Sequence, residues 1–384
     1  LTTLGIVIGV MTVITIVALI QGLNRAFATE ISKIGTTTLY VSKFPWIMGG
    51  REWFTFRNRP NLTVHEAQKL KEMMTTAVAV APTLYARRPV SYRDRTADGV
   101  IIVGTTEDYM ETSNVLPESG RFLSETDVRH RRSVCVLGQD VLKVLFPTGD
   151  PIGKRISIGG RKFTVIGVAE KKGNMFGDSM DNMVMVPIGV FQAVFGARWR
   201  SVDIEVKVET PEEIDNAEIE LIGIMRRIRG LQGSQENNFA VNMQSMLMDT
   251  YKKLTGTLWA VAIGVGSISL FVGGIGIMNI LLVSVTERTR EIGIRKAIGA
   301  RRVDIMLQFL IESMMICALG VAIGTLLAVA FAKIVAAATP LPAAITVWVA
   351  VLGLTFVVAI GLFFGIYPAR KAAMLNPIEA LRYE

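Results

Sequence analysis

Charged residues are scarce in this sequence: 19% of its 384 residues are charged, against about 25% in an average soluble domain. The shortage is uneven, because long charge-free runs lie at the two ends while the middle has an ordinary soluble composition. This pattern excludes an all-soluble enzyme, a disordered chain and a fibrous repeat.

Residue patterns that carry chemistry are also missing. The sequence has no G-x-x-x-x-G-K-[ST] and no G-x-S-x-G motif, and its two histidines, His65 and His130, have no partners at metal-ligand spacing. We therefore expect no catalytic residue, no metal site and no cofactor bound by this chain. Acidic residues around Gly173–Gly177 suggest either a cation loop or a solvated glycine-rich hairpin tip, and we favour the tip; they are Glu170, Asp178 and Asp181.

Four apolar segments are long enough to cross a bilayer, which takes about 20 residues as a helix. Basic residues concentrate in one short loop, with six basic against three acidic residues in Glu287–Asp304, so that loop and the tail are predicted to be cytosolic. We expect a retained first anchor instead of a cleaved signal peptide, and a basic cytosolic stretch before it. The predicted order is helix 1–24, external segment 25–253, helix 254–286, cytosolic loop 287–304, helix 305–337, outer loop 338–344, helix 345–369 and cytosolic tail 370–384.

The external segment has the pattern of an α+β domain with two lobes. A capping box formed by Thr63 and Glu66 predicts a helix through Met74, and Gly159-Gly160 predicts a hairpin turn. A second helix is predicted from Pro211 to about Arg229. The net charge of the whole external segment, +4, is too small to indicate a nucleic-acid partner. Strands are predicted at 38–42, 100–103, 133–137, 155–158, 163–168, 184–186 and 202–208.

The two cysteines cannot pair within one chain, because Cys135 lies in a predicted external strand and Cys317 in a predicted span. The external domain must therefore be held by its apolar core. Inside the third span, Glu312 is an intramembrane charge that we expect to face protein or the cytosolic headgroups. An ion-driven carrier would need more such groups near the bilayer midplane.

Small residues in the predicted spans favour close packing between helices, within one chain or between two copies. The candidate packing and dimer residues are Gly5, Gly9, Gly266, Ser269, Gly273 and Gly276.

The cytosolic loop combines an apolar stripe with basic residues. In a helix, Ile294, Ala297 and Ile298 fall on one face, which suits a groove on a partner protein. The alternative is that the basic residues only fix topology and touch lipid headgroups. The stripe favours coupling, and the candidate ATPase-coupling residues are Arg290, Glu291, Ile294, Arg295, Lys296, Ile298 and Arg301.

Several stretches resemble the MacB/LolC/FtsX-type ABC transporter permeases. The segment ERTREIGIRKAIGARRVDIMLQFLIES resembles the cytosolic loop of that family, and KAAMLNPIEALRYE resembles its C-terminus. The start, LTTLGIVIGVMTVITIVAL, resembles its first span. The external motifs SGRFLSETD, VLGQDVLKVLFP and DPIGKRISIGGRKFTVIGV resemble the MacB-type periplasmic core domain.

This resemblance implies a multi-pass permease of the bacterial inner membrane, with its large domain on the periplasmic side. It further implies a separate cytosolic ATPase that holds ATP and Mg, a homodimer or a pair with a paralogous permease, a periplasmic adaptor and an outer-membrane channel. MacB itself carries its ATPase fused at the N-terminus, and no such domain is present in these residues.

Residues 44–60 form an aromatic and basic insertion where the family pattern predicts a short connection. We weigh two interpretations equally: a loop that contacts a partner or substrate, and a cover for the sheet edge. Its candidate contact residues are Phe44, Trp46, Arg51, Trp53 and Phe54.

Three functions compete at this stage. The leading one is the permease of an ATP-driven exporter that transmits ATPase motion to the periplasmic domain. The others are a lipoprotein-releasing permease and an FtsX-like transmitter that activates an external enzyme.

Overall fold

The computed structural model describes residues 2–32, 34–50, 52–175, 177–196, 200–338 and 347–381. The chain divides into two compact units, each of which is described by itself. The membrane unit comprises Leu1–Thr29 and Thr250–Glu384, and the outer domain comprises Glu30–Asp249.

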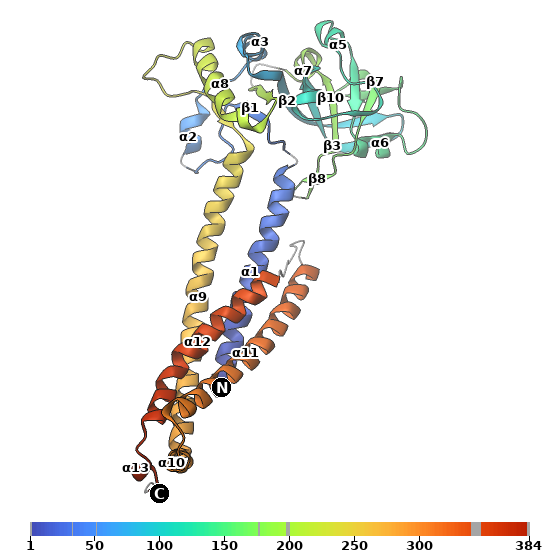
Figure 1. Ribbon diagram of the computed structural model, residues 1–384. Coiled ribbons are helices and arrows are strands. Elements are labelled where there is room, and N and C mark those ends of the chain that lie inside the picture. Colours follow the sequence, from blue (N-terminus) through green and yellow to red (C-terminus); the bar gives the residue numbers. More distant parts are fainter. Residues whose placement is uncertain are drawn as a thin grey trace. The chain divides into compact units, whose positions relative to one another are not determined.

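Long apolar helices build the membrane unit (Figure 1). Among the described residues, three helical stretches are long and apolar enough to cross a membrane: Val7–Ser32, Gln244–Glu287 and Arg302–Val335. Helix α12 begins at Val347, within the predicted fourth span, so the count of four stays a prediction. Most of the predicted outer loop lies outside the described residues. The helices are α1 (Thr2–Ser32), α9 (Gln244–Glu287), α10 (Thr289–Ala297), α11 (Arg302–Ala338), α12 (Val347–Met374) and α13 (Pro377–Leu381).

Glycines in the membrane unit lie where two helices approach closely. A Cβ atom on Gly5 would be 3.1 Å from the Cα of Gly273, and one on Gly266 would be 2.3 Å from Cγ2 of Val13. Both pairs join α1 to α9, as small residues in membrane helices commonly do. Gly9 is buried, and Ser269 and Gly276 are half-buried. The structure thus uses part of the predicted packing set within one chain, and their role in a dimer stays a prediction.

The outer domain is α+β, as the sequence predicted. Its strands are β1 (Thr38–Ser42), β2 (Ala77–Tyr92), β3 (Arg95–Thr105), β4 (Pro117–Gly120), β5 (Val134–Leu137), β6 (Arg155–Ile158), β7 (Arg161–Ala169), β8 (Asn174–Met175), β9 (Asp178–Ser179), β10 (Met183–Pro187), β11 (Asp203–Val208) and β12 (Ala240–Asn242). Its helices are α2 (Glu52–Arg57), α3 (Val64–Met73), α4 (Tyr109–Thr112), α5 (Glu125–Arg129), α6 (Gln139–Leu145), α7 (Ile188–Phe195), the 3-10 turn η1 (Pro211–Glu213) and α8 (Ile214–Ile228).

Strand β2 belongs to both lobes of the outer domain. Its first half, Ala77–Thr83, pairs with β11, which continues through β1 to β12. Its second half pairs with β3 and β6, and the order β2-β3-β10-β5-β7-β6 returns to β2, so these strands close into a ring. Helices α3 and α8 cover the first lobe, while α6 and α7 pack on the ring (Figure 1). Strand β4 pairs with β7 outside this ring and forms the end of the sheet.

Local signals in the outer domain are confirmed. Thr63 and Glu66 form the capping box of α3, which ends at Met73 with Met74 as its C-cap. Gly159 and Gly160, both at positive φ, form the turn between β6 and β7. Cys135 and Cys317 are both buried free thiols, as expected.

Candidate functional site: the α10 segment and the aromatic loop

Helix α10 is short and sharply bounded. It begins after Arg288 and ends at Ala297, and Gly299 at φ +105° then turns the chain, a conformation that favours glycine. The next helix is capped within two residues, because the Asp304 carboxylate accepts a hydrogen bond of 2.9 Å from the Arg301 amide. Two helices are therefore joined at a fixed, tight corner.

One face of α10 is buried and the other is open. Ile292 and Gly293 face inward, and Ile292 belongs to a buried cluster with Ile305 and Phe309 of α11 and with alanines of α12. On the other face, 48% of Ile294 and 81% of Ile298 is exposed. The buried face fixes α10 in place, so the exposed isoleucines are presented by a packed helix instead of a loose loop.

Some charged residues of the predicted coupling set bind within the chain. Arg295 makes an ion pair of 2.5 Å with Glu291 and donates to Gln308 Oε1 at 2.5 Å. Lys296 Nζ donates to the Ala373 and Leu375 carbonyls at 2.6 and 2.8 Å. Lysine suits that place, since the last carbonyls of a helix lack helical partners. Burial, with Arg302 nearby, lowers the pKa of Lys296.

Other predicted residues lie outside these contacts. Arg290 and Arg301 are exposed beside the open face. The carboxylate of Glu312, which is predicted to lie in the membrane, makes an ion pair of 3.3 Å with Arg288, so the structure gives it a protein partner next to the segment. Sequence analysis did not single out three exposed apolar residues on the neighbouring helices α11 and α13. They are Val303, Leu307 and Ile378, and the four-residue spacing of the first two was the available signal.

The insertion at residues 44–60, here called the aromatic loop, carries α2 and exposes its rings. None of the residues of α2 is buried, and 41% of Trp53 and 69% of Phe54 is exposed. Trp46 is partly exposed, and its ring lies 4.9 Å from that of Tyr40 on β1. Phe44 is half-buried and Arg51 lies outside the described residues. The start of the loop therefore packs on β1, whereas α2 has no buried residue, and the choice between the two interpretations stays a prediction.

The neck of the aromatic loop is closed by polar bonds. Lys43 Nζ donates to Asn61 Oδ1 at 3.0 Å, and Arg59 Nη1 donates to the Lys43 carbonyl at 3.3 Å. Asn242 of β12 holds the start of the loop by donating to Ser42 Oγ at 2.8 Å and accepting from the Trp46 amide at 2.8 Å. These bonds hold the two ends of the loop together.

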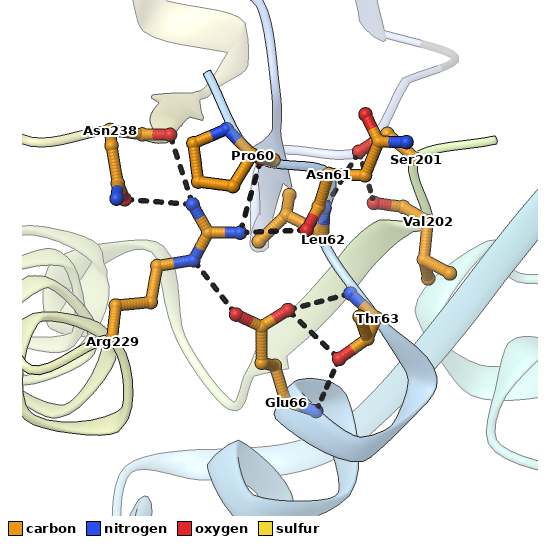
Figure 2. A network of polar contacts seen from close by, with 9 residues as sticks. All are labelled: Pro60, Asn61, Leu62, Thr63, Glu66, Ser201, Val202, Arg229 and Asn238. Carbon is orange, nitrogen blue, oxygen red and sulfur yellow. Dashed lines mark hydrogen bonds and ion pairs between the residues drawn. The ribbon is translucent and has the colours of Figure 1, made fainter. Parts of the chain in front are cut away.

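Arg229 holds the far end of the aromatic loop (Figure 2). Its side chain, only 3% exposed, pairs with Glu66 at 2.8 Å. Its remaining donors reach the Pro60 and Asn61 carbonyls at 3.3 and 3.0 Å and both oxygens of Asn238. Glu66 in turn accepts from the Thr63 amide at 2.6 Å. A guanidinium with all its donors occupied fixes the loop against α8 and α3.

A buried carboxylate explains the motif SGRFLSETD. The carboxylate of Asp127 is buried and accepts from Arg121 at 2.5 and 3.3 Å and from Ser124 Oγ at 2.7 Å. Burial alone would raise the pKa of Asp127, but the hydrogen bonds from Arg121 and Ser124 lower it to about 2. The motif is thus a structural clamp of the outer domain.

Asp181, one of the acidic residues near Gly173–Gly177, is bound within the hairpin itself. Asp181 is buried and accepts hydrogen bonds from the Lys172 and Gly173 amides at 2.8 and 2.9 Å, which closes the β8–β9 hairpin. No group of three metal-ligating side chains was found among the described residues.

Two family models match this chain and leave a short gap between them. Residues 1–224 match the MacB-like periplasmic core domain, and residues 263–377 match the FtsX-like permease C-terminal region. The first match runs from residue 1 into α8 and includes the aromatic loop. The second covers α10 and the helices around it.

Curated relatives are similar over the whole chain. It is 35% identical over 388 residues to the "Macrolide export ATP-binding/permease protein MacB" of Bdellovibrio bacteriovorus, covering 100% of the chain and 59% of that protein. The protein of the same name from Rhodospirillum rubrum is 38% identical, with 100% of the chain and 58% of that protein covered. The chain thus spans about three fifths of the length of these relatives.

A solved structure, the periplasmic region of MacB from Actinobacillus actinomycetemcomitans, is also similar. Its TM-score is 0.48 at 21% identity, covering 58% of this chain and 95% of that one. On the family models and the whole-chain relatives together, the chain belongs to the MacB- and FtsX-type ABC transporter permeases.

Proposed function

We propose that this chain is the permease of an ATP-driven exporter in the bacterial inner membrane, and that it passes the motion of an ATPase to its outer domain. The observation that supports the proposal most is the open face of α10. Ile294 and Ile298 are exposed on a helix whose opposite face is packed, with Arg290 and Arg301 beside them. Exposed apolar side chains ringed by charge are typical of a protein docking surface.

The ATPase, with its ATP and Mg, lies outside these 384 residues in this proposal. The name of these relatives combines ATP binding with permease activity and gives macrolide export as their function. That name favours export over lipoprotein release or signal transmission, and it leaves the cargo of this chain unassigned.

Helix α9 offers the route for the motion. It starts two residues after β12 and runs unbroken for 44 residues, from Gln244 to Glu287, just before α10. At about 1.5 Å per residue it is about 66 Å long, roughly twice the thickness of the hydrocarbon core. A push on α10 is thus delivered to one end of a helix whose other end enters the outer domain. A homodimer, or a pair with a paralogous permease, working with an adaptor and an outer-membrane channel completes the proposed machine.

The test is the double variant Ile294→Asp/Ile298→Asp in the full chain, reconstituted in nanodiscs with its ATPase. Burying two new carboxylates against the partner costs several kcal/mol at a desolvated contact, so ATPase binding and stimulation of ATP hydrolysis should both be lost. Insertion and thermal stability should remain, because both positions are exposed within this chain.

A matched control is Ile219→Asp, which adds the same charge at an exposed isoleucine of α8 in the outer domain. The control should bind and stimulate the ATPase normally. Normal coupling in the double variant would show that the α10 segment only sets topology.

A further inference from the structure

The aromatic loop has the composition of a membrane-interface element. From Phe44 to Pro60 it contains five aromatic residues and three basic residues against one acidic residue, Glu52. Two of the five tryptophans of the whole chain lie in it. Tryptophan is enriched at the level of lipid headgroups, where its ring meets apolar tails and its N–H meets water, and basic residues attract anionic lipids.

The structure holds cations beside two rings of the loop, the exposed Trp53 and the half-buried Phe56. The Arg57 guanidinium lies 5.4 Å from the centre of the Trp53 ring, and that of Arg59 lies 4.1 Å from the centre of the Phe56 ring. Trp53 and Phe54 meet edge to face at 5.4 Å. Apolar rings with cations along them match the layered chemistry of a bilayer surface, in which phosphates lie just outside the acyl chains.

The loop is presented rigidly, because both of its ends are fixed. Asn242 holds its start, the Lys43–Asn61 bond closes its neck, and Arg229 holds its end at Pro60 and Asn61. Its exposed rings are therefore pre-organised, and little conformational entropy is lost on contact with a surface.

Chain connectivity allows the loop to reach the bilayer. Asn242, which holds the loop, lies two residues before α9 begins, and the charge-free run of α9 begins at Leu254. Ten helical residues from Gln244 to Leu254 span about 15 Å. The headgroup layer fills about 5–7 Å of that distance, and a few extended residues of the loop cover the remainder at about 3.3 Å each.

We propose that the aromatic loop docks on the outer leaflet of the bilayer, with Trp53 and Phe54 among the headgroups and upper acyl chains and Arg57 on anionic phosphates. This contact is separate from the proposed coupling at α10. It would give the outer domain a second point of support on the membrane, beyond the two helices that connect to it.

The experiment uses the full chain in nanodiscs of phosphatidylcholine and phosphatidylglycerol, with an environment-sensitive fluorophore on Phe54→Cys. The two native cysteines are buried. A share of the lipid carries a nitroxide quencher high on its acyl chain. We expect strong quenching and a blue-shifted emission at position 54. The matched control, Ile219→Cys on α8, should show neither.

Quenching at position 54 no greater than at position 219 would overturn the proposal. A blue-shifted emission without quenching would overturn it too, because it would mean that a protein surface, such as a second copy or an adaptor, covers the loop.

A charge variant tests the phosphate contact. Arg57→Gln, which removes one exposed cation, should lower the ratio of docked to undocked loop about fivefold in the anionic bilayer. Arg87→Gln, at an exposed arginine on β2, is the control and should leave the ratio unchanged. Equal docking of the Arg57 variant and its parent would contradict a contact with anionic lipid.

Discussion

In the outer domain, buried charged side chains join segments far apart in the sequence, whereas the helices of the membrane unit meet through glycines. Arg229 and Glu66 pair across 163 positions, and Glu205 is buried on β11 with hydrogen bonds of 2.9 and 2.6 Å from Thr112 and Ser113. In the membrane unit, Gly5 meets Gly273 and Gly274 meets the Phe364 ring.

The contrast follows from the solvent of each part. In water, the apolar core drives folding, and buried ion pairs fix which segments meet. In lipid, an apolar side chain gains no free energy by moving from the acyl chains into a helix contact. Close fit between helix backbones therefore has to hold the helices together. The outer domain should therefore fail when a charge loses its partner, and the membrane unit when a helix contact is overfilled.

The largest effect is expected at the Arg229 network. Arg229→Met leaves Glu66 without its partner and should lower the stability of the outer domain by about 3–5 kcal/mol. Thermal unfolding of the full chain in nanodiscs measures this. The neighbouring Arg227→Met changes an exposed arginine of the same helix and should shift stability by less than about 0.5 kcal/mol. Similar losses in both variants would mean that the network adds nothing specific.

An overfilled helix contact is the matching test in the membrane unit. A Cβ on Gly274 would lie 2.3 Å from the Phe364 ring, so Gly274→Leu should cost about 1–3 kcal/mol. Gly264→Leu on the same helix meets no atom within 4 Å and is the control. Resistance to unfolding in increasing denaturing detergent compares the two. Equal stability of both variants would show that α9 does not pack on α12 through this glycine.

A half-buried carboxylate should give the outer domain a pH dependence. Burial raises the pKa of Asp203 to about 6, so the folded state keeps this proton to a higher pH than the unfolded state does. The contribution of this group to the free energy of unfolding is fully present below about pH 4, and it is lost as the pH rises to about 6.

Asp203→Asn removes the free-energy cost of ionising this carboxyl in the folded state. The variant should melt like the parent near pH 4 and exceed it by up to about 2 kcal/mol above pH 6. Melting curves across this range test the prediction. A constant difference at all pH values would show that Asp203 is not titrating there.

The smallest effect is expected at the ion pair of Glu312 with Arg288, since both side chains are partly exposed. Glu312→Gln should change the stability of the membrane unit by less than about 1 kcal/mol. A loss of several kcal/mol in the same detergent assay would place this carboxylate in a desolvated site.

Local bonds were predictable from the sequence. The Thr63–Glu66 capping box, the Gly159-Gly160 turn and the bounds of β1 each depend on residues within a few positions of one another. Strand β2, the longest strand among the described residues, was missed. Its Pro82 and Pro89 argue against a paired strand, and the structure places Pro89 at a shift of register between Arg88 and Val90.

The candidate site was predictable in the same partial way. Spacing along one helix indicated the open face of Ile294 and Ile298, because helical periodicity is a local property. The bonds of Lys296 to carbonyls 77 and 79 positions away, and the Arg229 network, depend on tertiary structure. No pattern within either segment indicates them.

Strand β2 also decides how the outer domain can come apart. Because its two halves pair with different sheets, neither lobe keeps all its strands if β2 is pulled away. The two lobes should exchange their backbone amides with solvent in one shared opening event instead of two independent ones. A load that reaches the domain at one lobe is therefore borne by both, without a flexible linker between them to absorb it.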